Sequence, residues 1–154
     1  MHVVGMITPY LKVKGAKAFV DTIGEGAGVF SRLRELGYHQ AYSCKFSEGA
    51  KKLSDITEVR TFANMRAYLY WAVRDWLDPK NGFLPALPPN DFLMQECTEV
   101  KWKFQSDGSI IIEPKEDIKK RLGRSTDYID ALANTFYPKD YESVSDNEIF
   151  GDML

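Results

Sequence analysis

The chain has 154 residues, of which 44% are hydrophobic and 27% are charged, and its formal net charge at pH 7 is -2. This length suits one domain, and the hydrophobic content excludes a disordered chain. A slightly negative net charge gives no overall attraction to nucleic acid, so any surface that binds nucleic acid must be local. The two cysteines, Cys44 and Cys97, have no CxxC motif or histidine cluster beside them, which excludes a structural zinc site.

The sequence also indicates where the domain ends and in which compartment the protein is expected. No apolar stretch reaches the roughly 20 residues that a membrane span requires, and the start lacks the features of a signal peptide. We therefore expect a cytoplasmic protein without membrane contacts. Residues 1–138 form the expected domain, and residues 139–154 form an expected mobile tail with five acids and one lysine.

The N-terminal part predicts a βαβ unit. Residues 1–14 fit a helix loosely, and residues 16–21 predict a short buried strand. A glycine-rich turn at residues 24–28 leads into a helix that Gly37 is expected to end, and residues 40–46 predict a second strand. The two strands are then parallel, with Asp21 at the carboxyl end of the first, where sites in α/β folds usually lie.

The C-terminal part predicts helices and one hairpin. The longest helix is expected from about Thr61 to Leu77, where Pro79 stops it. Its aromatic residues are more consistent with packing than with a platform for stacking bases. Four elements follow: a short helix that Asp91 can cap, a hairpin over residues 100–112, a helix over residues 115–122, and a helix from Ser125 or Thr126 to about Phe136.

Three carboxylates indicate a metal site. Asp127 and Asp130 lie three residues apart, which places both on one face of the last predicted helix. Asp130 stands among apolar residues, and an acid near a core is costly unless it is paired or bound to a metal ion. With Asp21, these acids would form an oxygen-rich pocket of the kind that Mg²⁺ or Mn²⁺ prefers.

Each acid also has an ordinary interpretation. Asp21 can be a capping or turn acid at the end of a strand. Asp127 can be a cap or first-turn acid, favoured there by the helix dipole. The glycine-rich turn does not match a nucleotide-binding loop, and we interpret its glycines as permitting a tight turn beside Asp21.

A basic segment, residues 115–124, precedes the acidic pair. On charge pattern alone it is a solvated helix face. Beside a metal pocket, however, basic groups are what a phosphodiester substrate requires, since they hold the backbone while the ion polarises the phosphate. The residues expected near DNA phosphates are Lys119, Lys120, Arg121 and Arg124.

Three blocks of the chain, Phe19–Gly37, Asn64–Leu77 and Ile112–Leu132, resemble the C-terminal nuclease domain of tailed-phage terminase large subunits. The likeness spans about residues 15–137 in the same order, and the last block is its most specific part. It implies an α/β, RNase H-like fold with a mixed sheet flanked by helices, in a protein of a bacterial host cell. It also implies cleavage of concatemeric double-stranded DNA during genome packaging, by up to two Mg²⁺ or Mn²⁺ ions.

The resemblance also implies which residues bind metal and which molecules the chain binds. Asp21 matches the second acid of the family's cluster, and Asp127 and Asp130 supply the last. DNA is the implied partner, with the portal or other packaging-motor proteins beside it. Residues 1–14 match a helix that follows the family's first strand, so we expect an N-terminally truncated domain that lacks the first acid and the packaging ATPase.

A two-metal mechanism needs an acid that bridges both ions. Without the first acid, the chain would bind one ion weakly and would cut poorly or not at all. One alternative to the nuclease is a non-catalytic prophage remnant or an assembly module, which the missing acid favours over a resolvase. A second alternative is a small resolvase-like nuclease that acts on branched DNA.

Overall fold

The computed structural model describes residues 2–138, and the predicted acidic tail lies outside them. In chain order the elements are α1 (His2–Leu11), β1 (Ala18–Asp21), α2 (Gly26–Glu35), β2 (Ala41–Cys44), α3 (Met65–Leu77), the 3-10 turn η1 (Pro79–Asn81), α4 (Asp91–Glu99), β3 (Trp102–Phe104), β4 (Ile110–Ile112), α5 (Lys115–Leu122) and α6 (Asp127–Asn134). The prediction of an α/β fold is confirmed. None of the described helices is long and apolar enough to cross a membrane.

Two helix starts differ from the prediction because asparagines cap them. Helix α3 begins at Met65 rather than near Thr61, since the Asn64 side chain accepts a hydrogen bond from the Ala67 N–H at 3.0 Å. Helix α4 is capped by Asn90 rather than by Asp91, through a bond of 2.9 Å from the Leu93 N–H. A side-chain oxygen that accepts from the third helical residue satisfies a donor that the helix leaves unpaired.

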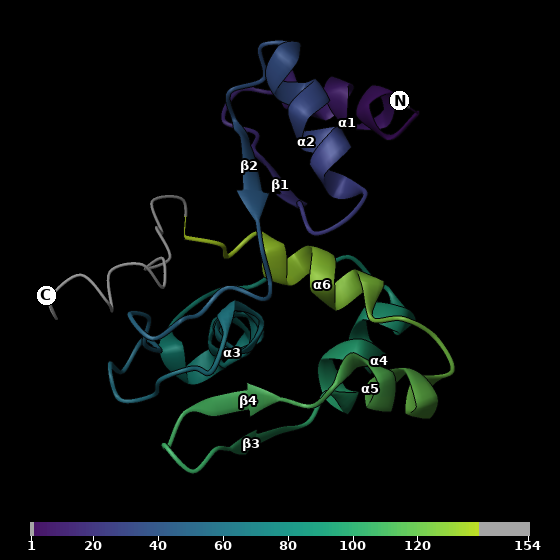
Figure 1. The fold of residues 1–154 in the computed structure, drawn as a ribbon. Coiled ribbons are helices and arrows are strands. Elements are labelled where there is room, and N and C mark those ends of the chain that lie inside the picture. The colour runs from purple at the N-terminus through teal and green to yellow at the C-terminus, as the bar shows by residue number, and fades with distance from the viewer. Residues whose placement is uncertain (1, 139–154) are drawn as a thin grey trace, which may run out of the picture.

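The predicted βαβ unit is confirmed. β1 and β2 pair in parallel, with Asp21 opposite Cys44, and α2 connects them. Side chains alternate along a strand, and on β1 Val20 packs with α1 and α2 whereas Phe19 packs against the larger core. Asp21 stands two residues after Phe19 and therefore lies on the larger-core side of the sheet. The carboxyl ends of both strands point toward α6 (Figure 1).

The described strands form two small sheets rather than one mixed sheet. β3 and β4 form the predicted antiparallel hairpin, and an isolated bridge joins Phe62 to Ile110 of β4. In Figure 1 helices α3 and α6 lie between this hairpin and the β1–β2 pair. Each sheet thus covers a different side of the same helical layer.

The larger core lies around α3 and α6. Its most deeply buried side chains include Phe62, Met65, Leu69, Val73, Ile110 and Ala133. Tyr70 and Trp71 of α3 are buried in the same cluster, which agrees with their interpretation as packing residues. A smaller cluster of Val4, Leu11, Leu33 and Ala41 holds α1 and α2 against β1 and β2.

The glycine-rich turn brings two backbone segments into close approach. A Cβ atom on Gly26 would stand 1.8 Å from the carbonyl oxygen of Asp21, which no side chain tolerates. Gly24 adopts a positive φ of 85°, a conformation that glycine adopts without strain. The prediction that these glycines permit a tight turn beside Asp21 is therefore confirmed.

Gly26→Ala should lower the free energy of unfolding by about 3 kcal/mol or more, because its Cβ forces the Asp21 backbone to move. The matched control is Gly28→Ala, two residues along α2, where a Cβ meets nothing within 4 Å. That variant should be as stable as the wild type or up to about 1 kcal/mol more stable. Urea denaturation followed by circular dichroism measures both changes, and equal stability of the two variants would contradict the prediction.

Candidate metal centre

Asp21 ends β1 and makes a local turn. Its Oδ1 atom accepts a hydrogen bond from the N–H of Ile23 at 3.0 Å, the turn role that the sequence leaves open for this residue. β1 also contacts α6, the helix that carries the other two predicted acids. The bond to Ile23 fixes the side chain at the carboxyl end of the strand.

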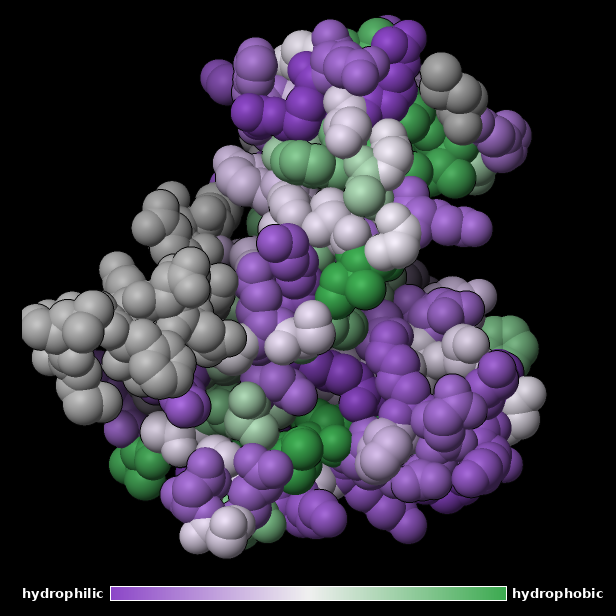
Figure 2. Space-filling model, viewed as in Figure 1, coloured by the Kyte–Doolittle hydropathy of each residue, from purple (hydrophilic) through white to green (hydrophobic). Residues whose placement is uncertain are grey.

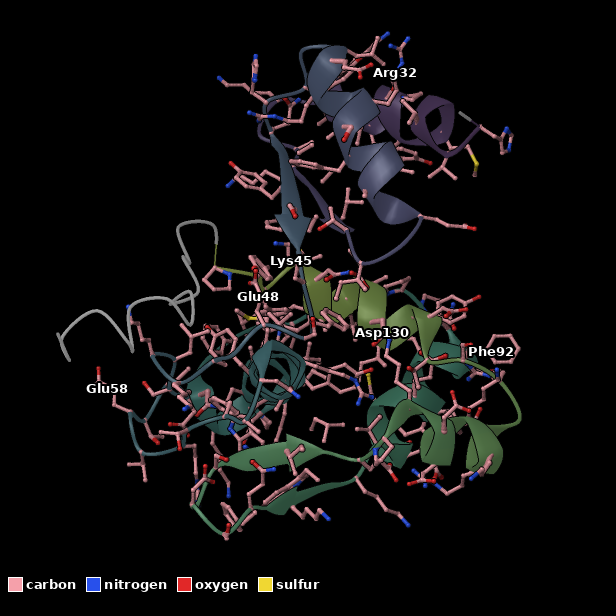
Figure 3. All side chains as sticks on the ribbon, in the orientation of Figure 1. Arg32, Lys45, Glu48, Glu58, Phe92 and Asp130 are labelled. Carbon is pink, nitrogen blue, oxygen red and sulfur yellow. The ribbon has the colours of Figure 1, made fainter. Side chains whose placement is uncertain are left out.

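Asp130 is held by three side chains from three parts of the chain. Its Oδ1 accepts a hydrogen bond of 2.5 Å from the Tyr70 hydroxyl, and its Oδ2 lies 2.8 Å from the Lys115 Nζ and 3.3 Å from the Thr126 hydroxyl. Its side chain is 18% exposed. This confirms that the acid lies near the core and needs a partner. Figure 3 shows Asp130 on α6, close to where the β1–β2 unit meets the helices.

Tyr70 is a hydrogen-bond donor at neutral pH. Burial and then the negative charge of Asp130 raise the pKa of this phenol far above its ordinary value of 10. Its ring also lies under the Arg66 guanidinium, 5.0 Å from the ring centroid. The hydroxyl is therefore a fixed partner for one oxygen of Asp130.

Asp127 and Asp130 share one small cavity, as their spacing predicts. The cavity has a volume of about 140 Å³ and is lined by Lys115, Glu116, Lys119, Ser125, Thr126, Asp127 and Asp130. Thr126, not Asp127, is the residue at the N-cap position of α6. Asp127 is exposed in the first turn, where the helix dipole favours an acid.

The three predicted acids do not form one cluster. Within residues 2–138, no three histidine, cysteine, aspartate or glutamate side chains lie close enough together to hold a metal ion. The cavity nevertheless has the chemistry of a hard-cation site: its acids and hydroxyls are oxygen donors, and an ammonium group already stands against Asp130. Mg²⁺ keeps several waters and needs only one or two carboxylates, so the Asp127 and Asp130 pair fits such an ion.

The four basic residues predicted near DNA have different surroundings. Lys119 lines the cavity, and the Lys120 side chain is 78% exposed, 3.7 Å from Asp117. Arg121 pairs with Glu113 at 2.5 Å and Glu99 at 3.3 Å, and its hydrogen bonds lower the pKa of Glu113. Arg124 pairs with Glu96. The surface over α4 and α5 is largely hydrophilic in Figure 2. Contact of these four residues with DNA stays a prediction.

Glu96 is a structural residue of the site that the sequence reasoning missed. It is fully buried, its Oε1 pairs with Arg124, and its Oε2 accepts the Ile129 N–H at 2.8 Å. Thr126 makes no side-chain capping bond, so Glu96 supplies the cap of α6 from another helix. A signal was present, since Glu96 stands three residues after the buried Leu93 on an amphipathic helix.

Comparison with solved structures identifies the fold of the chain. The chain aligns with the nuclease domain of the large terminase subunit gp2 of bacterial virus Sf6, with a TM-score of 0.64 and 23% identity over 89% of this chain and 70% of that one. This is the fold of a phage terminase nuclease domain. The predicted RNase H-like fold is thereby confirmed.

Two further structures of that terminase domain match equally well. A mutant solved with manganese is 23% identical and one solved with calcium is 24% identical, each with a TM-score of 0.63 over 88% of this chain and 70% of the other. No protein-family model and no curated protein matches the sequence. At these identities the likeness to the terminase nuclease domain establishes the fold.

Removal of the buried cap should destabilise the terminase-like fold. Glu96→Ala leaves Arg124 without its buried partner and the Ile129 N–H without its acceptor, so we expect a loss of about 3 kcal/mol in the free energy of unfolding. The matched control is Glu99→Ala on the same helix, whose ion pair with Arg121 is more exposed and should cost less than about 1 kcal/mol. Urea denaturation measures both losses, and similar values would refute the role of Glu96.

Proposed function

We propose that this chain is the nuclease domain of a phage terminase large subunit and cleaves concatemeric DNA with divalent metal ions during genome packaging. Two observations together carry the proposal. The chain has the terminase nuclease fold, and two acids on one face of α6 line a cavity in which the Lys115 ammonium is paired with Asp130. A bacterial host cytoplasm is the proposed location, with double-stranded DNA, the portal and other motor proteins as partners.

In this proposal Asp127 and Asp130 bind the ion, and Asp21, which lies outside their cavity at the end of the neighbouring β1, moves toward the ion when it binds. A bound Mg²⁺ or Mn²⁺ would polarise the scissile phosphate and activate a water molecule. Lys119, which lines the cavity, and Lys120, which is exposed on the same helix, would hold the DNA backbone. Arg121 would contact a phosphate in place of its exposed partner Glu99, and Arg124 would do so through its exposed Nη2 while Nη1 stays paired with the buried Glu96.

A second candidate is a non-catalytic module of the packaging machinery. The observation that favours it is that no three metal-binding side chains meet within the described residues. Such a module would keep the fold and the capped helix α6 but would not hydrolyse DNA. The resolvase-like alternative has no comparable observation in its favour.

The deciding experiment incubates the chain with supercoiled plasmid and Mn²⁺ or Mg²⁺. We expect nicking by the wild type and a loss of more than about 100-fold in Asp130→Ala and Asp21→Ala, because the ion loses a ligand. The matched control is Asp91→Ala. It removes an exposed acid from the first turn of α4 and therefore changes the net charge of the chain by the same amount.

The outcomes separate the candidates. No nicking by the wild type, with DNA binding retained, would support the non-catalytic module. Nicking that persists unchanged in Asp130→Ala and Asp21→Ala would show that other residues hold the ion. Equal losses in Asp91→Ala would mean that the assay reports folding or charge rather than the site.

A further inference from the structure

A second, larger pocket is lined by residues from α3, α4, α6 and the β3–β4 hairpin. Its volume is about 390 Å³, within the range of roughly 300–1,000 Å³ that is typical of small-molecule sites. The lining combines apolar side chains with three aromatic rings, one arginine and one aspartate. This pocket shares no lining residue with the cavity of Asp127 and Asp130, so it is a separate site.

An aromatic row runs along the pocket and beyond it. The Trp102 ring of β3 lines the pocket, with its centroid 5.0 Å from that of Trp71 on α3 and 5.3 Å from that of Phe104. Phe104 lies outside the lining and continues the row. Trp102 is 44% exposed and Phe104 is 48% exposed. Partly exposed rings of this kind can stack on a planar ligand.

Two side chains of opposite charge line the same pocket. The Arg74 guanidinium lies 4.4 Å from the centroid of the Trp71 ring, and its Nη1 donates to the neighbouring Asp75 at 3.1 Å. The Asp78 Oδ1 accepts the Lys80 N–H at 3.0 Å. Arg74 therefore keeps donors for an anion, and Asp78 keeps an oxygen that can accept from an amino group.

We propose that this pocket binds a nucleotide whose base carries an exocyclic amino group. The base stacks on Trp102, its amino group donates to Asp78, and its phosphate pairs with Arg74. Adenine, guanine and cytosine carry such a group, whereas thymine would place a carbonyl oxygen against the carboxylate. A free nucleotide and an unpaired base of a single strand share this chemistry. The site goes beyond the proposed nuclease function and requires no metal ion.

Arg60 can distinguish a strand from a free nucleotide. Its guanidinium lies 5.3 Å from the centroid of the Phe104 ring, outside the lining of the pocket. Within residues 2–138 no carboxylate forms an ion pair with Arg60. The next phosphate of a strand that follows the aromatic row would contact Arg60, whereas the phosphate of a single nucleotide stays at Arg74.

The test is isothermal titration calorimetry with EDTA present, so that neither a bound metal ion nor cleavage contributes. The probes are deoxyadenosine monophosphate, thymidine monophosphate and deoxyribose 5-phosphate. We expect deoxyadenosine monophosphate to bind, thymidine monophosphate to bind at least about tenfold more weakly, and the sugar phosphate to show no binding. Because the pocket and the metal cavity share no lining residue, the result does not depend on whether the chain cuts DNA.

Trp102→Leu keeps an apolar side chain but removes the stacking surface, so it should bind deoxyadenosine monophosphate about tenfold more weakly. The matched control is Tyr10→Leu, which removes an exposed ring from α1, outside the pocket, and should change the affinity by less than about twofold. Circular dichroism verifies that both variants fold.

Arg74→Met should weaken binding of deoxyadenosine monophosphate about fivefold and leave binding of deoxyadenosine, which has no phosphate, unchanged. The matched control is Arg32→Met, which removes an arginine that is paired with Glu35 on α2 and should change neither affinity.

A short oligodeoxyadenylate identifies the source of the nucleotide. If it binds more tightly than the mononucleotide and Arg60→Met removes that gain, the ligand is a single strand. If both probes bind equally and Arg60→Met changes neither, the ligand is a free nucleotide.

Four results would overturn the inference. They are an absence of binding by both adenine probes, equally tight binding of deoxyribose 5-phosphate, equally tight binding of thymidine monophosphate, and equal losses in Trp102→Leu and Tyr10→Leu.

Discussion

The buried carboxylate of Glu96 determines where helix α6 lies. It accepts the Ile129 N–H and pairs with Arg124, so one side chain fixes both the first turn of α6 and the segment before it. Helix α6 in turn contacts α3, α4 and β1, and it carries Asp127 and Asp130. A charge without access to water is costly unless it is paired. Here the pairing with Arg124 fixes the position of α6 against the helices and the strand that it contacts.

Three ion pairs neutralise charged groups around helix α5 and the acidic pair. Asp130 of α6 is paired with Lys115 of α5, Glu113 with Arg121 of α5, and Glu96 of α4 with Arg124. These pairs convert a basic run in the sequence into a set of fixed contacts. The net charge of -2 therefore says little about the surface near the acids, where Lys119 and Lys120 remain exposed.

Elements with clear local signals could be predicted from the sequence. Helix α5 has the predicted bounds because Pro114 precedes it and Gly123 ends it in a left-handed conformation. The shared face of Asp127 and Asp130 follows from the helical period alone. The cap of α4, by contrast, is ambiguous in the sequence, because Asn90 and the neighbouring Asp91 are equally good capping residues.

Relations between distant segments were beyond sequence reasoning. Nothing local indicates that Arg124 reaches Glu96, or that Tyr70 and Lys115 take the two oxygens of Asp130. The distance between Asp21 and the pair on α6 likewise depends on how a strand packs against a helix. Periodicity predicts which face a residue occupies, but not which face of another element lies opposite.

The division of the interior into two clusters has a consequence for cooperativity. The β1–α2–β2 unit and α1 rest largely on the small cluster around Leu33, whereas α3 and α6 share the larger one. Regions with fewer buried contacts open at a lower free-energy cost than the global transition. We therefore expect amide hydrogens of β1 to exchange faster than those of α3, so that Asp21 belongs to a less stable unit than Asp130.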